Sequence, residues 1–169
     1  MLSTTLAKAL NIQTNLEFFS SNLYLQMSSW CMQKGLEGCA NFFRQHADEE
    51  RMHMQKLFDY INETGSYAVL DSINPPQNEF SSVVEIFEIT YAHEQMITKE
   101  INSLVSIAFE EQDFSTFNFL QWYVAEQHEE EQLFKAVLDK VELIGMEGNG
   151  LFFIDQEVAK MHNAAQVSQ

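Results

Sequence analysis

Glu126-Gln127-His128-Glu129-Glu130-Glu131 places four carboxylates, one amide and one imidazole in six consecutive residues. The surrounding segment, 117–141, carries apolar residues every three or four positions, which is typical of the buried face of a helix. Gln127 and Glu131 fall on that apolar stripe, and Glu130 lies beside Gln127 one turn on. A run of charges is ordinarily a solvated helix face, and this remains an alternative for the other glutamates. Polar groups on an apolar stripe require a chemical reason.

Three other segments show the same interruption of an apolar stripe. Glu17, Glu50 and Glu94 each take a position at which helical spacing predicts an apolar residue. His53 follows Glu50 by three residues, so both side chains lie on one helix face. A buried, unpaired carboxylate costs on the order of several kcal/mol. Carboxylates that face one another in a core therefore need protons, paired cations or metal ions.

The elements that must position these groups are four long helices. Capping residues and glycines place them at about residues 4–34, 37–64, 82–111 and 115–144. The candidate N-caps are Ser3 or Thr4, Ser82 with Glu85 at capping-box spacing, and Asp113 or Ser115. Each interrupting polar group lies near the middle of its helix. Helices of equal length that pack side by side overlap at their midpoints, so we expect the polar groups at one level of the core.

The connection at residues 66–81 contains Asn74-Pro75-Pro76 and has no helical periodicity, so it is predicted to be a loop. A loop of this length reaches roughly 50 Å, whereas a helix of about 28 residues is roughly 42 Å long. The loop can therefore cross the whole bundle and leave the second and third helices parallel. This predicts an all-α fold, a four-helix bundle with one long crossover connection.

The chain has 169 residues, of which 46% are hydrophobic, so a single domain over 1–169 can bury a full core. Only six Gly and two Pro are present, which argues against a sandwich or a barrel. Within the domain we expect the four-helix bundle at 4–145, a short fifth helix at about 151–162 and a flexible tail at 163–169.

Charge and cysteine usage limit the partners and the compartment. The 25 acidic residues against nine Lys and Arg give a net charge of −16, which repels nucleic acid and anionic membranes but attracts cations. No stretch approaches the roughly 18 apolar residues of a spanning helix. Cys31 and Cys39 match no zinc or redox spacing and are interpreted as buried free thiols. We therefore expect a cytoplasmic protein.

The polar groups together predict a dinuclear metal site. Glu50-x-x-His53 presents a carboxylate and an imidazole on one helix face, and Gln127-x-x-Glu130 presents an amide and a carboxylate. With one glutamate from each of the other two helices, four carboxylates balance the charge of two divalent ions. Oxygen ligands with one nitrogen and no sulfur suit iron or manganese better than structural zinc.

The same residues resemble the non-haem bacterial ferritins, which are di-iron carboxylate proteins with the ferritin-like fold. The resemblance covers essentially the whole chain. It is carried by Asn15-Leu16-Glu17, Ala47-Asp48-Glu49-Glu50-Arg51-Met52-His53, Tyr91-Ala92-His93-Glu94-Gln95, the segment 117–131 and Gly150-Leu151-Phe152-Phe153-Ile154-Asp155.

The resemblance implies a role for individual residues. One iron of a ferroxidase centre would be held by Glu17, Glu50 and His53, and the other by Glu50, Glu94 and Glu130. Gln127 would lie beside these ligands, and Tyr24 would supply an electron during oxidation. A third iron, typical of the bacterial members, would use Glu49, Glu126, Glu129 and Glu130.

The function implied by the resemblance is iron storage with ferroxidase activity. Fe(II) would bind at the centre, dioxygen would oxidise it, and Fe(III) would be stored as mineral inside a hollow shell. Such a shell is normally a homo-oligomer of twenty-four subunits. Residues of the chain support assembly indirectly, because Leu151 to Ile154 are apolar and lie beyond the bundle.

Relatives and other functions remain as alternatives. A bacterioferritin would repeat Glu-x-x-His where this chain has Glu130, and would place a haem-ligating Met where Arg51 stands, so no haem is expected. A rubrerythrin would carry a second domain with four cysteine ligands. A dinuclear oxidase, peroxidase or catalase would share the same ligands but store nothing. A metal-free scaffold would hold its carboxylates protonated. His46, His93 and His128 are expected beside the site or on the surface, not on metal.

Overall fold

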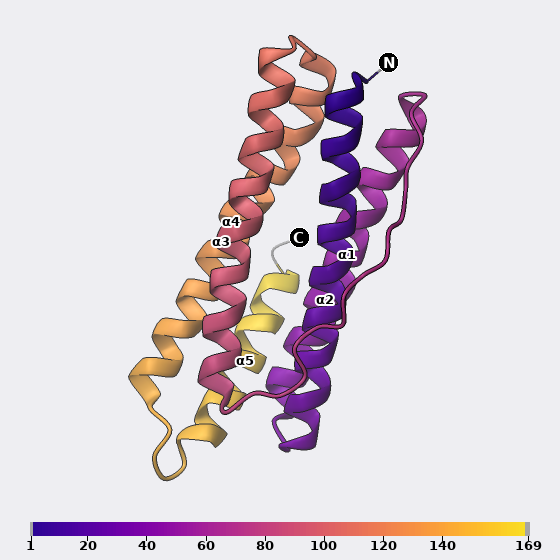
Figure 1. Cartoon of the computed structure of the whole chain (residues 1–169). Helices are drawn as coiled ribbons and strands as arrows, with labels where there is room; N and C mark the ends of the chain where they lie inside the picture. The colour runs from indigo at the N-terminus through magenta and orange to yellow at the C-terminus, as the bar shows by residue number, and fades with distance from the viewer. Residues whose placement is uncertain (1, 168–169) are drawn as a thin grey trace.

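The computed structural model describes residues 2–167, with side chains as far as residue 161 (Figure 1). Five helices occupy the described residues: α1 (Thr4–Gln33), α2 (Glu37–Glu63), α3 (Val83–Glu110), α4 (Phe114–Ile144) and α5 (Gly150–Val167). The four long helices form the predicted bundle, and the predicted fold class is confirmed.

The helix ends follow the capping chemistry of the sequence. Ser3, Ser82 and Asp113 each accept a hydrogen bond from the backbone N–H three residues on, at 3.0, 3.1 and 3.1 Å. Ser3 rather than Thr4, and Asp113 rather than Ser115, are therefore the N-caps. Gly35 and Gly145 follow α1 and α4 with φ of 75° and 73°, a conformation that favours glycine.

The connection between α2 and α3 runs along the bundle beside α1, so that α2 and α3 are parallel as predicted (Figure 1). Two asparagines of α1 hold this loop. The Asn11 amide donates to Tyr67 O and accepts from Val69 N, at 3.2 and 2.6 Å. Asn15 donates to Val69 O and accepts from Asp71 N, at 2.9 and 2.8 Å. Two asparagines one helical turn apart thus provide hydrogen-bond partners for backbone groups of the loop, which has no neighbouring strand to pair with.

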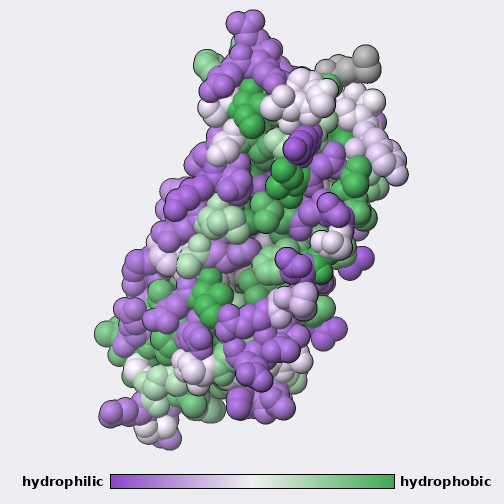
Figure 2. Space-filling model, in the orientation of Figure 1, coloured by the Kyte–Doolittle hydropathy of each residue, from purple (hydrophilic) through white to green (hydrophobic). Residues whose placement is uncertain are grey.

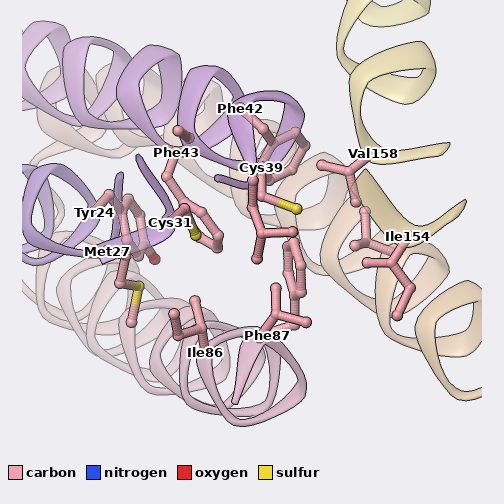
Figure 3. Packing of buried hydrophobic residues seen from close by; sticks show 14 of the residues in the cluster. Tyr24, Met27, Cys31, Cys39, Phe42, Phe43, Ile86, Phe87, Ile154 and Val158 are labelled. Carbon is pink, nitrogen blue, oxygen red and sulfur yellow. The ribbon is translucent and has the colours of Figure 1, made fainter. Parts of the chain in front are cut away.

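The apolar core is divided into two parts. One part contains Phe42, Phe43 and Phe87 near the start of α2, where α5 also packs (Figure 3). The other contains Leu57 and Ile101 toward the opposite end. The mid-helix residues between the two parts are the polar groups singled out from the sequence, so the core is interrupted at one level.

α5 folds back against the N-terminus of α2. Its Asp155 carboxylate accepts hydrogen bonds from Gly38 N and Cys39 N, at 3.0 and 2.8 Å. The N-cap residue of α2, Leu36, offers no side-chain hydrogen bond, so Asp155 supplies the cap from another helix. A Cβ at Gly38 would lie 2.2 Å from Asp155 O, which explains why the contact requires glycine.

The fifth helix differs from expectation in two respects. It continues to Val167, so the predicted flexible tail at 163–169 is helical as far as that residue, and its last two residues lie outside the described part of the chain. Ile154, expected to lack a core, is fully buried. Phe152 and Phe153 remain exposed. The alternation of buried and exposed positions on a helix accounts for this split.

The surface is a mosaic of hydrophilic and hydrophobic side chains, as the face in Figure 2 shows. The largest exposed apolar side chains on α1 are Ile12, Leu25 and Met32, each about half exposed. In residues 2–167, no helix is long and apolar enough to cross a membrane.

Candidate metal centre

The four groups that interrupt the apolar stripes lie together in the middle of the bundle. Glu17, Glu50, Glu94 and Gln127 are all buried, with exposures of 1%, 3%, 0% and 3%. They come from the middle of α1, α2, α3 and α4 respectively. Four polar side chains, three of them carboxylates, thus share one closed site.

The buried stripe of α4 keeps Leu120, Gln127, Phe134 and Val141 as predicted but differs by one residue at the positions between them. Glu130, rather than Glu131, is buried, and Tyr123 and Val137 replace their apolar neighbours as core residues. The residues next to Tyr123 and Val137 on the predicted stripe, Val124 and Leu138, are apolar too, so periodicity alone does not decide which of them face the core. A tertiary contact does: the Tyr123 hydroxyl donates to His53 O at 2.7 Å.

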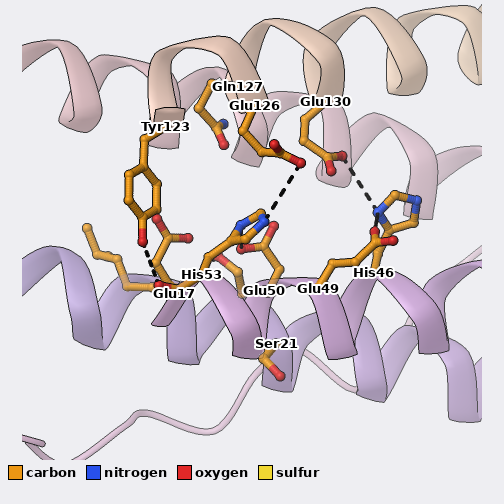
Figure 4. Close-up of polar contacts among 12 residues, drawn as sticks. Glu17, Ser21, His46, Glu49, Glu50, His53, Tyr123, Glu126, Gln127 and Glu130 are labelled. Atoms are coloured by element: carbon orange, nitrogen blue, oxygen red, sulfur yellow. Dashed lines mark hydrogen bonds and ion pairs between the residues drawn. The ribbon is translucent and has the colours of Figure 1, made fainter. Parts of the chain in front are cut away.

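Glu17, Glu50 and His53 form a first group of ligand atoms, here called the Glu17 cluster. Their ligand atoms all lie within 4.8 Å of one another. His53 Nδ1 is 3.3 Å from Glu50 Oε2 (Figure 4). Gln13 donates a hydrogen bond to Glu17 Oε1 at 2.9 Å. Two carboxylates and one imidazole on two adjacent helices can hold one divalent ion.

Glu94 is held by hydrogen bonds at both of its oxygens. The Tyr24 hydroxyl donates to Glu94 Oε1, and the Gln127 amide donates to Glu94 Oε2 at 3.0 Å. Both donors are buried. Tyr24 and Gln127 therefore orient the carboxylate.

A second group of ligand atoms was not expected in this form. His46, Glu49 and Glu130 also have ligand atoms within 4.8 Å of one another and are here called the His46 cluster. His46 Nδ1 lies 3.0 Å from Glu49 Oε2 and 3.6 Å from Glu130 Oε2. The sequence predicts His46 beside the site or on the surface, and in the structure its imidazole points at Glu49 and Glu130, two of the predicted ligands (Figure 4).

The carboxylates predicted for a third ion are only partly brought together. Glu49 and Glu130 meet in the His46 cluster. Glu126 instead lies with its Oε1 4.0 Å from His53 Nε2, and Glu129 is exposed. The helical offsets of three and four put Glu126, Glu129 and Glu130 on one face of α4, but their carboxylates do not converge on a single point in this structure.

Three buried oxygens accept no hydrogen bond within residues 2–161: Glu17 Oε2, Glu50 Oε2 and Glu130 Oε2. Buried polar atoms are ordinarily paired, because an unmade hydrogen bond costs about 1–3 kcal/mol. One such oxygen belongs to each of three helices and to one or other cluster. The atoms that lack partners are thus the ones that a cation would use.

Burial raises the pKa of the carboxyl groups of the centre. The pKa of Glu17 rises to about 7, with the charge of Glu94 adding to burial, and that of Glu130 rises to about 8. The pKa of Glu50 lies well above its ordinary value because of burial and the charge of Glu94. Burial lowers the pKa of His53 to about 4. Near neutral pH the centre holds protons and presents a neutral imidazole, and a divalent ion would displace the protons.

His46 titrates in the opposite direction from His53. Burial works against its charged form, but Glu130 and Glu49 outweigh burial and raise the pKa of the imidazole. At Glu49 burial raises the pKa of the carboxyl, but the hydrogen bond and the charge of His46, together with the hydrogen bond from Gln45, outweigh burial and lower the pKa. Two buried histidines seven residues apart therefore have different electrostatic surroundings: the charges of Glu130 and Glu49 act on His46, whereas burial dominates at His53 and the charges of His46 and Lys56 lower the pKa of His53 further.

Two aromatic residues of the site were not predicted from the sequence. Tyr123 links α4 to the backbone of His53, as described above. Trp122 packs edge-on to the His53 ring at 5.2 Å and carries Lys56 over its own ring at 4.3 Å. Shifting the α4 stripe by one residue would have placed Tyr123 in the core. Nothing in the spacing predicted that Trp122 packs edge-on against the His53 ring.

Known proteins resemble this chain over almost its full length. The ferritin-like domain matches residues 7–144. A probable bacterial non-heme ferritin-like protein of Haemophilus influenzae is 56% identical over 165 residues, which cover 98% of this chain and 100% of that one. A bacterial non-heme ferritin of Escherichia coli is 52% identical over 161 residues, covering 95% and 98%. An open-pore ferritin of the archaeon Archaeoglobus fulgidus has a TM-score of 0.91 at 42% identity, covering 94% and 98%.

Proposed function

The chain belongs to the ferritin family, and we propose that the buried groups at the level of Glu17 and Glu50 are its ferroxidase centre. Bacterial ferritins oxidise Fe(II) with dioxygen and store the iron, and this chain is an iron-storing ferroxidase of that kind. The observation that carries the residue assignment is the set of unpaired, buried carboxylate oxygens in the middle of the bundle.

Two Fe(II) ions are the substrates of this centre. Glu17, Glu50 and His53 hold one ion, and Glu50, Glu94 and Glu130 hold the other. Four carboxylates then neutralise two divalent ions, and each unpaired oxygen gains a partner. The geometry of the Glu17 cluster supports the first assignment, and the burial of Glu94 and Glu130 supports the second.

The protein groups prepare the oxidation in three ways. His53 is neutral and can bind metal without losing a proton, because burial lowers its pKa. The carboxyl groups release their protons as the ions bind. Gln127 and Tyr24 hold Glu94 in place, and Tyr24 can pass its proton to Glu94 as it gives up one electron. Dioxygen takes two electrons from the iron pair, and Tyr24 and a third Fe(II) are the candidate donors of the two more that reduction to water requires.

A third Fe(II) binds on the α2–α4 side of the centre, with Glu130 shared between it and the pair. The candidate carboxylates are Glu49, Glu126, Glu129 and Glu130. Like charges at these spacings repel one another unless a cation lies among them. The closeness of Glu49 to Glu130 favours this position.

We further propose that the chains assemble as a hollow shell of twenty-four subunits in the cytoplasm. Exposed apolar side chains on α1 and α5, among them Leu25, Phe152 and Phe153, offer surfaces for subunit contacts. Buried free thiols at Cys31 and Cys39 suit a reducing compartment.

The assignment is tested by Glu50→Ala, because Glu50 is proposed to touch both ions. Rapid Fe(II) oxidation, followed by absorbance of Fe(III), should fall by at least about 100-fold, since both ions lose a ligand. The variant should still fold, because removing one buried carboxylate relieves repulsion in the metal-free site. Glu88→Ala, an exposed glutamate of α3, is the control and should oxidise iron like the parent. Unchanged kinetics in Glu50→Ala would remove Glu50 from the centre.

A further inference from the structure

A small recess opens on the surface between α3 and α4, on a different side of the bundle from the proposed third ion. It has a volume of about 220 Å³, and its polar lining consists of Thr98 and Asn102 from α3 and Gln127, His128 and Glu131 from α4. Asn102 and His128 are exposed, Thr98 and Glu131 are half-buried, and Gln127 is buried. The polar lining therefore leads from solvent into the bundle. Its oxygen and imidazole groups are of the kind that Fe(II) accepts as ligands.

The inner end of the recess reaches the ferroxidase centre through one side chain. Gln127 lines the recess, and its Nε2 donates to Glu94 Oε2 at 3.0 Å. The same Nε2 lies 3.5 Å from Thr98 Oγ1. Burial raises the pKa of Glu94, and the charge of Glu131 adds to that rise, so Glu131 lies within electrostatic reach of the centre. One amide group thus separates the recess from a proposed iron ligand.

Glu94 differs from the other carboxylates of the centre in having partners at both oxygens. Three carboxylates each keep one buried oxygen that accepts no hydrogen bond within residues 2–161, whereas donors from α1 and α4 occupy both oxygens of Glu94. An ion that binds Glu94 from the recess must displace the Gln127 amide, because an N–H group directed at the oxygen repels a cation. A turn of that side chain frees Glu94 Oε2 and presents the amide oxygen to the ion instead.

Two other sides of the bundle are closed by hydrogen bonds near this level. Between α1 and α2, the Ser21 hydroxyl donates to Ala47 O at 2.7 Å, so the two backbones lie too close together for an ion to pass. Between α1 and α3, Ser20 bonds to the His93 ring at 2.8 Å. The alternative entrance is the α2–α4 side, where Glu126 is partly exposed.

We propose that the recess between α3 and α4 is an entrance for Fe(II) to the ferroxidase centre, and that the Gln127 side chain is its gate. Fe(II) meets the exposed rim first, is drawn inward by the charge of Glu131, and reaches Glu94 as the amide turns aside. One carboxylate along the passage attracts the ion without trapping it. The inference rests on the proposed ferroxidase centre, because the passage leads to Glu94, one of its assigned ligands.

The rate at which ions arrive tests the proposal. Assembled, metal-free protein is mixed anaerobically with Co(II), whose visible absorption changes when carboxylate and imidazole ligands bind it, and the change is followed by stopped flow. Thr98→Phe fills the passage and should slow arrival by about 10-fold or more, because close-packed side chains leave no room for an ion. The matched control is Ser103→Phe, an exposed hydroxyl residue of α3 outside the recess, which should bind Co(II) at the parent's rate.

A second variant tests the charge of the passage without changing its size. Glu131→Gln should slow arrival about threefold at low ionic strength and less at high salt, because salt screens the attraction. Glu88→Gln, which removes an exposed charge of α3 outside the recess, is the control and should keep the parent's rate. A slowing in Glu131→Gln that does not depend on salt would show that the charge does not attract the ion, and would overturn its role.

The number of ions bound at equilibrium separates this inference from the proposed function. It should equal the parent's in Thr98→Phe and Glu131→Gln, because neither residue is a proposed ligand of the centre. Unchanged arrival rates in both variants would overturn the entrance, and slow arrival in Glu126→Gln would then place it on the α2–α4 side, with the centre intact. A parent that binds no ion would instead overturn the centre itself. If light scattering shows that Thr98→Phe does not assemble, Asn102→Phe at the exposed rim replaces it.

Discussion

The buried carboxyl groups make the metal-free centre sensitive to pH, and the direction is set by their raised pKa values. Glu17 and Glu130 have pKa values of about 7 and 8 in the folded chain, against 4.5 in the unfolded chain. Their contribution to the free energy of unfolding is therefore fully present below about pH 4.5. That contribution is lost as the pH rises through 7 to 8. The melting temperature of the metal-free protein should therefore fall by several degrees between about pH 6 and pH 8.5.

Differential scanning calorimetry in the presence of a chelator measures this effect. Glu17→Gln and Glu130→Gln should flatten the dependence, because an amide does not titrate. Addition of Zn(II) should reverse it, since the metal binds the deprotonated form. A metal-free parent whose melting temperature rises over this range, or variants with the parent's slope, would contradict the pKa values.

Tyr24 and Tyr123 offer a matched pair of buried hydroxyls. Tyr24 donates to Glu94, whereas Tyr123 donates to the His53 backbone. Tyr24→Phe should bind Fe(II) normally but lose any transient tyrosyl radical detected by freeze-quench electron paramagnetic resonance during oxidation. Tyr123→Phe should keep the radical and lose about 1 kcal/mol of stability from one hydrogen bond. A radical that survives in Tyr24→Phe would exclude this residue as the electron donor.

Spacing alone identified three of the buried carboxylates of the centre. Glu17, Glu50 and Glu94 interrupt apolar stripes, and such an interruption is visible without a structure. His46 also lies at a buried position, but a histidine between apolar residues carries no comparable signal in the sequence. The direction in which Glu126 and Glu129 point depends on the rotation of α4, which the sequence does not encode locally.

At the scale of the helices, local chemistry predicted where elements begin and end, and tertiary contacts decided the rest. Ser82 and Asp113 cap their helices as expected. The length of the crossover loop was enough to predict parallel α2 and α3. Its anchoring by Asn11 and Asn15 was not predictable, because asparagine on a helix surface forms no pattern until the loop lies beside it.

The cap that α5 provides to α2 yields a prediction at this scale. Asp155→Ala removes two hydrogen bonds to backbone N–H groups and a negative charge from a helix N-terminus. We expect a loss of about 1–2 kcal/mol and faster proteolytic cleavage between α4 and α5, because α5 is released from α2. Thermal unfolding measures the first effect, and limited digestion with thermolysin, which can cleave at Met146 between the two helices, measures the second.

The control for this prediction lies on the same helix. Among the residues whose side chains the structure describes, Glu157 forms ion pairs with the exposed Lys140 and Lys160, at 2.7 and 2.6 Å, and surface ion pairs contribute little. Glu157→Gln should therefore leave both measurements near those of the parent. Equal behaviour of Asp155→Ala and Glu157→Gln would show that the cap does not hold α5.

At the scale of the whole molecule, the closed centre and the exposed apolar surface raise the question of what the single chain lacks. The proposed iron ligands all come from one chain, so we expect oxidation of the bound Fe(II) to need no partner subunit. Storage does, because oxidised iron must collect in a space that a bundle with a filled core does not contain. An oxidase that acts on a small molecule would share the centre without needing a shell.

Assembly therefore decides between these functions. Size-exclusion chromatography with light scattering should give a particle of about twenty-four chains of 19.6 kDa, roughly 470 kDa. Phe152→Asp places a charge on an exposed apolar side chain of α5, outside the metal centre, and should yield smaller species if that surface is a subunit contact. Such species should still oxidise the Fe(II) bound at the centre, but any further iron should precipitate. The parent should instead keep far more iron in solution than its ligands can bind. A parent that remains monomeric or dimeric at micromolar concentration, and that retains no iron beyond its ligands, would instead be a dinuclear oxidase.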